Sequence, residues 1–274
     1  MKSLDNKVVV ITGAGSGIGR GLALKAAAKG ARLAISDWNE AGLNETVALL
    51  KESGAKEIKA DQLDVSDKAA FIAYAKDVAE HYGVVNVIIN NAGVTYSGPV
   101  DQIEYKDFEW IMSINFWGVV YGTQEFLPHL IASGDGHIVN ISSLFGLISM
   151  PGQATYNASK YAVRGYTEAL REDMLVEGHK VGVTCVHPGG IKTGIARNGR
   201  ATAAEDVAKL AEIFDEKLAR MSPDKAADII IGAILANRPR QLVGLDAHAI
   251  HWTGKLLGAR YQDVFAAASK RILP

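Results

Sequence analysis

Six short strand-like runs, separated by longer amphipathic stretches, limit the fold of this chain more than any other feature. The stretches have helical periodicity, and we predict helices at about 17–29, 39–52, 67–82, 104–132 and 154–177. Most runs are apolar on both faces, which is typical of parallel strands covered by helices. The pattern predicts an α/β protein with a single doubly wound parallel sheet. The runs are KVVVIT (7–12), ARLAIS (31–36), EIKADQLDV (57–65), VVNVIIN (84–90), GHIVNIS (136–142) and KVGVTCV (180–186).

The turn after the first predicted strand is rich in glycine. It reads TGAGSGIG and contains Gly13, Gly17 and Gly19. Glycines permit a tight turn and let backbone N–H groups approach a pyrophosphate at a helix N-terminus. The spacing differs from the usual G-x-G-x-x-G, and such a turn can also bind nothing. No G-K-[ST] follows, which excludes a P-loop. We interpret the turn as the dinucleotide site of a Rossmann-like sheet.

An acidic residue, Asp37, ends the second predicted strand. A carboxylate at this place can accept both ribose hydroxyls of an adenosine and would repel a 2′-phosphate. Its neighbours Ser16, Trp38 and Asn39 carry no positive charge that could offset the repulsion. The sequence therefore favours NAD over NADP, although Asp37 could instead cap the next helix.

A tyrosine and a lysine, Tyr156 and Lys160, stand four residues apart in a predicted helix and share one face. The preceding strand delivers Ser142 and Ser143 to the sheet edge where nucleotides bind. A free phenol titrates near 10, too high for a base at neutral pH. A nearby ammonium and a positively charged nicotinamide would both favour the phenolate, so we expect the pKa of Tyr156 to fall. The pair indicates proton transfer beside a cofactor.

Seven motifs now stand in order along the chain: TGAGSGIG, LDVS (63–66), NNAG (90–93), SINFWG (113–118), NISS (140–143), YNASK (156–160) and HPGGIKT (187–193). Together they resemble the short-chain dehydrogenase/reductase family in its compact one-domain form. The resemblance covers roughly residues 7–194, and a weaker similarity continues to about residue 246. A lone Tyr-x-x-x-Lys is weak evidence, but seven motifs at compatible spacing are strong.

The resemblance assigns roles to four catalytic residues. It implies that Tyr156 is the acid/base, that Lys160 lowers its pKa and holds the nicotinamide ribose, and that Ser143 hydrogen-bonds the substrate oxygen. Asn115 would fix a water that links Lys160 to solvent. The implied cofactor contacts, besides Tyr156 and Lys160, are Gly13, Ser16, Gly17, Ile18, Gly19, Asp37, Trp38, Asp64, Val65, Asn91, Ala92, Gly93, Pro188, Gly189, Ile191 and Thr193. We expect that His187 is not a catalytic residue, because the Tyr156–Lys160 pair already provides proton transfer.

The expected function is an NAD-dependent oxidoreductase that interconverts a secondary alcohol and a ketone. Alternatives are an NADP-preferring ketone reductase, a non-catalytic NAD-sensing regulator and a methyltransferase, though the last has no use for the Ser–Tyr–Lys set. Loops 94–100, 144–154 and 190–222 should form the substrate pocket. Their side chains are mainly apolar, which favours a hydrophobic alcohol: Val94, Tyr96, Leu144, Phe145, Leu147, Met150, Gln153, Ile191 and Ile195.

Composition narrows the class of partners. The chain has 29 basic and 30 acidic residues, which argues against nucleic acid. Its single cysteine, Cys185, allows no intramolecular disulfide, and we expect no metal site. No apolar stretch is long enough for a membrane span, so we expect a cytoplasmic protein. The family resemblance implies a homodimer or homotetramer.

The chain has no low-complexity linker, and we predict one catalytic, dinucleotide-binding domain over residues 1–246. Within it, 191–222 would be a substrate loop or lid that includes an amphipathic helix at 201–220. Residues 240–246 (RQLVGLD) would be the last strand. Residues 247–274 would form a helical extension of the same domain. From Leu257 its apolar residues recur at helical spacing. The extension could pack on its own subunit or cleft, on a partner subunit or on a membrane surface.

Overall fold

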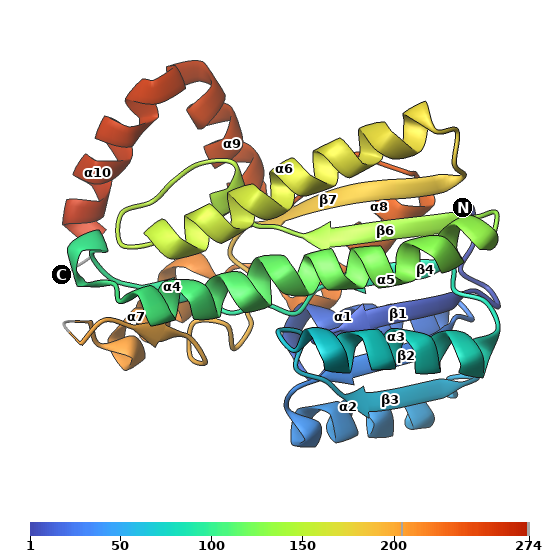
Figure 1. Ribbon diagram of the computed structural model, residues 1–274. Helices are drawn as coiled ribbons and strands as arrows, with labels where there is room; N and C mark the ends of the chain where they lie inside the picture. Colours follow the sequence, from blue (N-terminus) through green and yellow to red (C-terminus); the bar gives the residue numbers. More distant parts are fainter. Residues whose placement is uncertain (204, 273–274) are drawn as a thin grey trace.

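Strands with uninterrupted apolar sequence lie at the centre of the molecule. The computed structural model describes residues 1–203 and 205–272, and its main sheet has seven parallel strands in the order β3-β2-β1-β4-β6-β7-β9 (Figure 1). The strand order reverses beside β1, as in other doubly wound sheets. The strands are β1 (Val8–Thr12), β2 (Arg32–Asp37), β3 (Ile58–Gln62), β4 (Val87–Asn90), β6 (Gly136–Ile141), β7 (Val181–Pro188) and β9 (Arg240–Val243).

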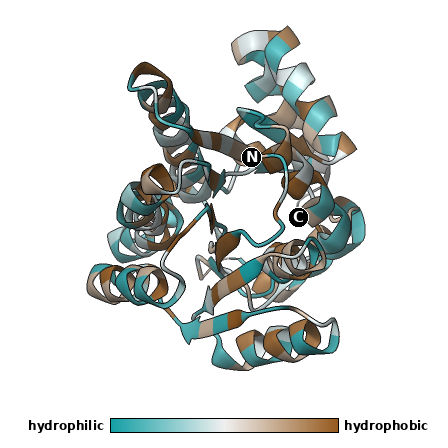
Figure 2. Cartoon of the chain, turned by 90° about the vertical axis from the view of Figure 1, so that its right-hand side faces the viewer, coloured by the Kyte–Doolittle hydropathy of each residue, from teal (hydrophilic) through white to brown (hydrophobic). Residues whose placement is uncertain are grey.

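Helices cover both faces of this sheet, because alternate side chains of each strand point to opposite sides. Val9 and Ile11 of β1 pack in a cluster with α1 and α8, whereas Val8 and Val10 pack in a second cluster with α3 and α5. Hydrophobic and hydrophilic residues both occur on the flanking helices, as expected of helices with one buried face (Figure 2). The predicted fold class is confirmed. The helices are α1 (Gly17–Ala28), α2 (Glu40–Glu52), α3 (Lys68–Tyr82), α4 (Tyr105–Met112), α5 (Gly118–Ala132), α6 (Ala154–Val176) and α8 (Pro223–Leu235).

Two parts of the chain differ from the sequence prediction near the carboxyl edge of the sheet. The stretch predicted as one helix over 104–132 is α4 and α5 joined by a π-helical turn, Ser113–Trp117. Where one helix was predicted over 201–220, the segment predicted as a lid contains a short helix, α7 (Val207–Ile213), followed by another π-helical turn, Phe214–Leu218. A small parallel pair that the sequence did not indicate, β5 (Tyr96–Ser97) and β8 (Arg200–Ala201), joins this segment to the loop after β4.

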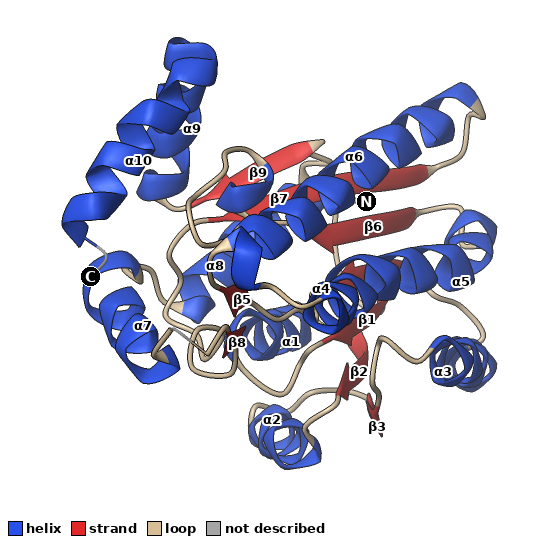
Figure 3. Ribbon diagram, turned by 60° about the vertical axis from the view of Figure 1, so that its left-hand side comes forward, coloured by secondary structure: helices blue, strands red, loops and turns tan. Residues whose placement is uncertain are grey.

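The C-terminal extension is a helical hairpin and begins earlier than predicted. Strand β9 ends at Val243, because Gly244 takes a positive φ of 111° and turns the chain into α9 (Leu245–Leu257). The prediction of a strand to residue 246 was therefore wrong. A short 3₁₀ turn, Gly258–Arg260, leads to α10 (Tyr261–Ile272), and the two helices stand out from the body beside α6 (Figures 1 and 3).

Candidate active site

Three loops meet at the carboxyl ends of β1, β4 and β7. The Thr12 hydroxyl accepts hydrogen bonds from the backbone N–H groups of Asn91 (3.1 Å) and Ala92 (3.2 Å). A Cβ at Gly13, whose φ is +67°, would lie 2.8 Å from the Ala92 Cα, so only glycine fits. A Cβ at Gly17 would lie 3.0 Å from the Thr193 side chain. The glycine turn, the NNAG segment and the loop after β7 thus form one cradle.

Asp37 is held rigidly at the end of β2. One carboxylate oxygen accepts from the Gly15 N–H at 2.8 Å, and the other accepts from the Asn39 N–H at 2.9 Å. The side chain is 8% exposed. The helix cap that the sequence left as an alternative role belongs to Asn39, whose side chain accepts from the Gly42 N–H. Asp37 therefore presents a fixed negative charge beside the glycine turn.

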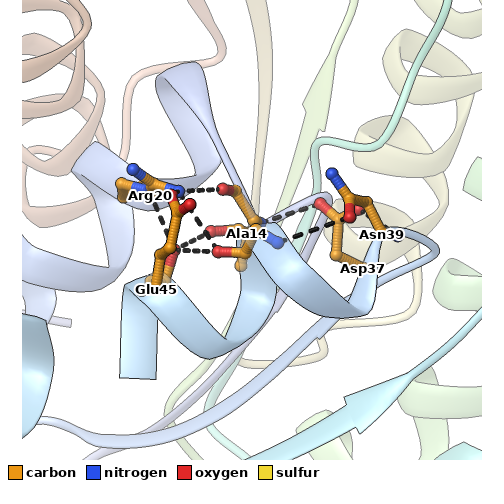
Figure 4. A network of polar contacts seen from close by, with 8 residues as sticks. Ala14, Arg20, Asp37, Asn39 and Glu45 are labelled. Carbon is orange, nitrogen blue, oxygen red and sulfur yellow. Dashed lines mark hydrogen bonds and ion pairs between the residues drawn. The ribbon is translucent and has the colours of Figure 1, made fainter. Parts of the chain in front are cut away.

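A polar network fastens helix α2 to the other side of the same turn (Figure 4). The Arg20 guanidinium donates to the Gly15 and Gly42 carbonyls and pairs with Glu45 at 2.8 Å. The buried Thr46 hydroxyl donates to the Ala14 carbonyl at 2.9 Å and accepts from Arg20 at 3.0 Å. These bonds occupy the Ala14 and Gly15 carbonyls, and the N–H groups of the same two residues donate to the Ser36 carbonyl and to Asp37, so the start of the turn is fixed on both sides.

The two serines at the end of β6 have different surroundings. The Ser142 hydroxyl donates to the Lys160 carbonyl at 2.8 Å, which fixes α6 against the strand. The Ser143 hydroxyl accepts from the Phe145 N–H at 3.1 Å, and it lies near enough to the Tyr156 phenol to lower the pKa of that phenol. The structure therefore brings Ser143, and not Ser142, to the phenol.

Lys160 and Tyr156 are both buried on the inner face of α6. The Lys160 side chain is 3% exposed, donates to the Ile141 carbonyl at 3.0 Å, and its Nζ lies 5.7 Å from the centre of the Tyr156 ring. Burial lowers the pKa of Lys160 to about 8. Burial also raises the pKa of the Tyr156 phenol, while the nearby Ser143 hydroxyl opposes the rise. In the protein without a cofactor, this direction is opposite to the one predicted, because desolvation outweighs the effect of Ser143.

Asn115 lies in the π-helical turn and is fully buried. Its side-chain oxygen accepts from the Val94 N–H at 2.8 Å, and its nitrogen donates to the Val94 carbonyl (2.9 Å) and to the Ser159 hydroxyl (3.1 Å). A Cβ on Gly93 would lie 3.1 Å from the Asn115 oxygen and 3.3 Å from the Lys160 Nζ. The glycine keeps open the space between these two polar groups. Such π-turns are frequent at functional sites.

One residue that sequence reasoning set aside lies against the site. His187, at the end of β7, is fully buried, and its Nδ1 donates to the Ser143 carbonyl at 2.8 Å. Burial lowers the pKa of His187 to about 4, so the ring is neutral. Its position before Pro188 was visible in the sequence, but nothing local indicated that its partner would be Ser143.

The remaining predicted cofactor residues occupy the same edge of the sheet. Ser16 is the N-cap residue of α1, Trp38 is exposed beyond β2, and Val65 is buried against Gly118. Asp64 is exposed and accepts from Ser66. The others lie in the segments already described: Ile18 and Gly19 in the first turn of α1, and Pro188, Gly189 and Ile191 at and beyond the end of β7.

The predicted substrate pocket divides into two apolar groups. Val94, Tyr96 and Phe145 pack with Tyr156, and the structure adds four residues that the sequence did not single out: Ile103, Trp110, Ile111 and Met112. Leu144 and Met150 instead pack with the C-terminal hairpin. Gln153 reaches across to β5, where its amide donates to the Ser97 hydroxyl at 2.6 Å.

Comparisons with known proteins agree with this geometry. A family model described as short chain dehydrogenase matches residues 7–204. SadH of Mycobacterium tuberculosis, an oxidoreductase by name, is 53% identical over 274 residues, which cover 100% of this chain and 99% of the relative. The chain belongs to the short-chain dehydrogenase/reductase family.

Solved structures lead to the same family. A short-chain dehydrogenase/reductase from Burkholderia phymatum, crystallised in complex with NAD, has a TM-score of 0.87 at 32% identity over 96% of this chain and 97% of that chain. Levodione reductase has a TM-score of 0.79 at 28% identity, over 90% of this chain and 98% of that one.

Family membership makes the protein an oxidoreductase that acts on CH–OH groups with a nicotinamide cofactor. Members of the family typically bind small-molecule substrates and form oligomers. None of the described helices is long and apolar enough to cross a membrane.

Proposed function

We propose that the protein is an NAD-dependent dehydrogenase/reductase that interconverts a hydrophobic secondary alcohol and its ketone, with Tyr156 as acid/base. The observation that carries the proposal is the burial of Lys160 beside Tyr156. An ammonium that is 3% exposed and bonded to the Ile141 carbonyl is costly to keep charged. Lys160 lies on the same helix face as the buried Tyr156 phenol, and a buried charge next to a titratable group is typical of a catalytic site.

The cradle at the sheet edge fits a nicotinamide dinucleotide. The N–H groups of the glycine turn would hold the pyrophosphate at the N-terminus of α1, and Asp37 would accept the adenosine ribose hydroxyls. Lys160 would hold the nicotinamide ribose. Because both carboxylate oxygens of Asp37 are fixed by backbone N–H groups, its charge cannot turn away from a 2′-phosphate. This supports NAD over NADP. When bound, the nicotinamide takes up or supplies the hydride.

The residues of the chain handle the proton and the substrate oxygen. In oxidation, the alcohol O–H proton passes to the Tyr156 phenolate as the C–H bond gives up its hydride and the C=O bond forms. The Ser143 hydroxyl would hydrogen-bond the same oxygen, and the Ser143 main chain is fixed by His187. Lys160 would stabilise the phenolate, since burial alone raises the pKa of Tyr156. Reduction reverses these steps.

The side chains packed with Tyr156 support an apolar substrate. Val94, Ile111 and Phe145 pack with Tyr156, and the Phe145 and Tyr156 rings meet edge to face at 6.1 Å. A hydrophobic alcohol would bury its carbon skeleton against these groups and leave its oxygen between Ser143 and Tyr156.

A panel of secondary alcohols tests the proposal, with NAD and NADP supplied separately and the reduced nicotinamide followed by absorbance. We expect turnover of apolar alcohols with NAD and much slower turnover of alcohols that carry a carboxylate. Binding of NAD without turnover of any alcohol or ketone would contradict the proposal and favour an NAD-sensing regulator.

A further inference from the structure

A cavity of about 190 Å³ lies between helix α9 and the body of the protein. Its wall carries two guanidinium groups, Arg164 of α6 and Arg240 of β9, and an ammonium, Lys255 of α9. His251, one turn before Lys255, completes the set. We propose that this cavity binds a phosphate group, either free phosphate or the phosphate of a lipid headgroup.

The charges around the cavity are unbalanced. Glu168 is the carboxylate that pairs with both guanidinium groups, at 3.2 Å from Arg164 and in close contact with Arg240. Lys255 forms no ion pair with any described residue, and its Nζ lies 5.2 Å from the centre of the Trp252 ring. Among the residues that the structure describes, three permanent cations line the cavity and one carboxylate, Glu168, pairs with two of them. Burial lowers the pKa of His251, and Lys255, Arg240 and Arg164 lower it further, as a positive environment requires.

The hydrogen-bond donors that line the cavity favour binding of an oxyanion with several oxygens. Guanidinium groups present planar pairs of N–H donors that match phosphate, and an ammonium adds a point charge. Arg164 and Arg240 are each about two-thirds buried, so their charges are only partly screened by water. The volume accommodates a phosphate with a few waters, since one water takes about 30 Å³.

The cavity is separate from the dinucleotide cradle but touches the segment that follows Ser143. Leu147 and Ile148 line it, and Arg164 donates to the Gly146 carbonyl at 3.5 Å. On its outer side, α9 exposes Leu245 (87%), Trp252 and Leu256 (83%), which the helical period places on one face. That apolar stripe is the reason to test a lipid source of the phosphate beside a free one.

The test measures phosphate binding to the NAD-saturated protein, so that the pyrophosphate site is filled. Titration calorimetry uses inorganic phosphate at constant ionic strength, and co-sedimentation uses phosphatidylcholine vesicles with and without phosphatidic acid. Lys255→Gln, on an exposed part of α9, should weaken binding about tenfold. Arg240→Gln should weaken it at least as much. The matched control Lys270→Gln, an exposed lysine of α10 outside the cavity, should leave binding unchanged.

Each result decides the proposal. Saturable binding of inorganic phosphate that Lys255→Gln weakens and Lys270→Gln does not supports the site with free phosphate as its ligand. Binding confined to vesicles that contain phosphatidic acid, with the same dependence on Lys255, supports a lipid headgroup. Lack of binding in both arms, or equal binding by the Lys255→Gln and Lys270→Gln proteins, would overturn the proposal.

Discussion

The two ends of the proposed dinucleotide cradle differ in how completely their buried polar groups are hydrogen-bonded. At the adenosine end, both oxygens of Asp37 accept backbone N–H bonds, and Thr46 and Arg20 occupy the nearby carbonyls. At the catalytic end, Lys160 keeps an ammonium with one carbonyl partner, and the buried Nε2 of His187 has no partner among the described residues. On the proposed function, the adenosine end would serve rigid recognition, and the catalytic end would hold charge that a bound cofactor completes.

The largest expected effect comes from removing the phenol at the catalytic end. Tyr156→Phe should lower turnover by about 10²–10⁴-fold, because general acid–base catalysis contributes on that scale. The affinity for NAD should change little. Tyr166→Phe, on the same helix but packed against Phe116, is the matched control and should keep near-normal turnover. Near-normal turnover by Tyr156→Phe would remove Tyr156 from the mechanism.

Replacing Lys160 should change activity and stability in opposite directions. Lys160→Met should abolish turnover and weaken NAD binding, yet raise the free energy of unfolding near pH 7 by roughly 1–3 kcal/mol, because it removes a buried ammonium. The pKa of Lys160 is about 8 in the folded protein and 10.5 in the unfolded chain. Between these values the unfolded chain binds more protons, so wild-type stability should rise with pH relative to Lys160→Met.

Denaturant unfolding of both proteins across that pH range measures this difference. A Lys160→Met protein that is less stable than the wild type at every pH would show that interactions in the folded protein offset the cost of burying the Lys160 ammonium. That result would contradict the difference proposed between the two ends of the cradle.

At the adenosine end, the charge of Asp37 should decide cofactor choice. The wild type should bind NAD at least tenfold more tightly than NADP, which needs only ~1.4 kcal/mol. Asp37→Asn keeps the shape and removes the charge, so it should flatten this ratio. Asp173→Asn, at an exposed carboxylate near the C-terminal end of α6, is the control and should leave the ratio unchanged. Isothermal titration with both cofactors measures it, and a wild type that prefers NADP would contradict the assignment.

The smallest effect is expected from the network that supports the glycine turn. Thr46→Val removes the hydroxyl that donates to the Ala14 carbonyl and should cost about 1 kcal/mol of stability. NAD should bind a few-fold more weakly, because the turn is held less firmly, while the NAD-to-NADP ratio stays the same. A changed ratio would mean that Thr46 acts on selectivity and not on rigidity.

Features set by neighbours in the chain could be predicted from the sequence. The strand pattern, the glycine turn and the four-residue spacing of Tyr156 and Lys160 are local, and they led to the sheet and to α6. Contacts between distant segments could not be predicted. The bond from His187 to Ser143 joins two strands, and Asn115 meets Val94 through a π-helical turn that helical periodicity does not reveal.

Two errors have the same origin. The pKa of Tyr156 was expected to fall because the sequence shows the lysine but not the depth of burial, which acts in the other direction. The strand predicted to residue 246 ends at Val243 because Gly244 adopts a positive φ, a conformation that glycine permits but does not require. Both depend on the packed structure.

Titration of the Tyr156 phenol tests the central claim most directly. The phenolate absorbance of the wild type, less that of Tyr156→Phe, gives the pKa of this group with and without NAD. We predict a pKa above the usual 10 in the free protein, because burial raises it, and a fall of at least about one unit when NAD adds its positive charge beside Lys160. The same pKa in both states would contradict the view that the catalytic end holds charge which the cofactor completes.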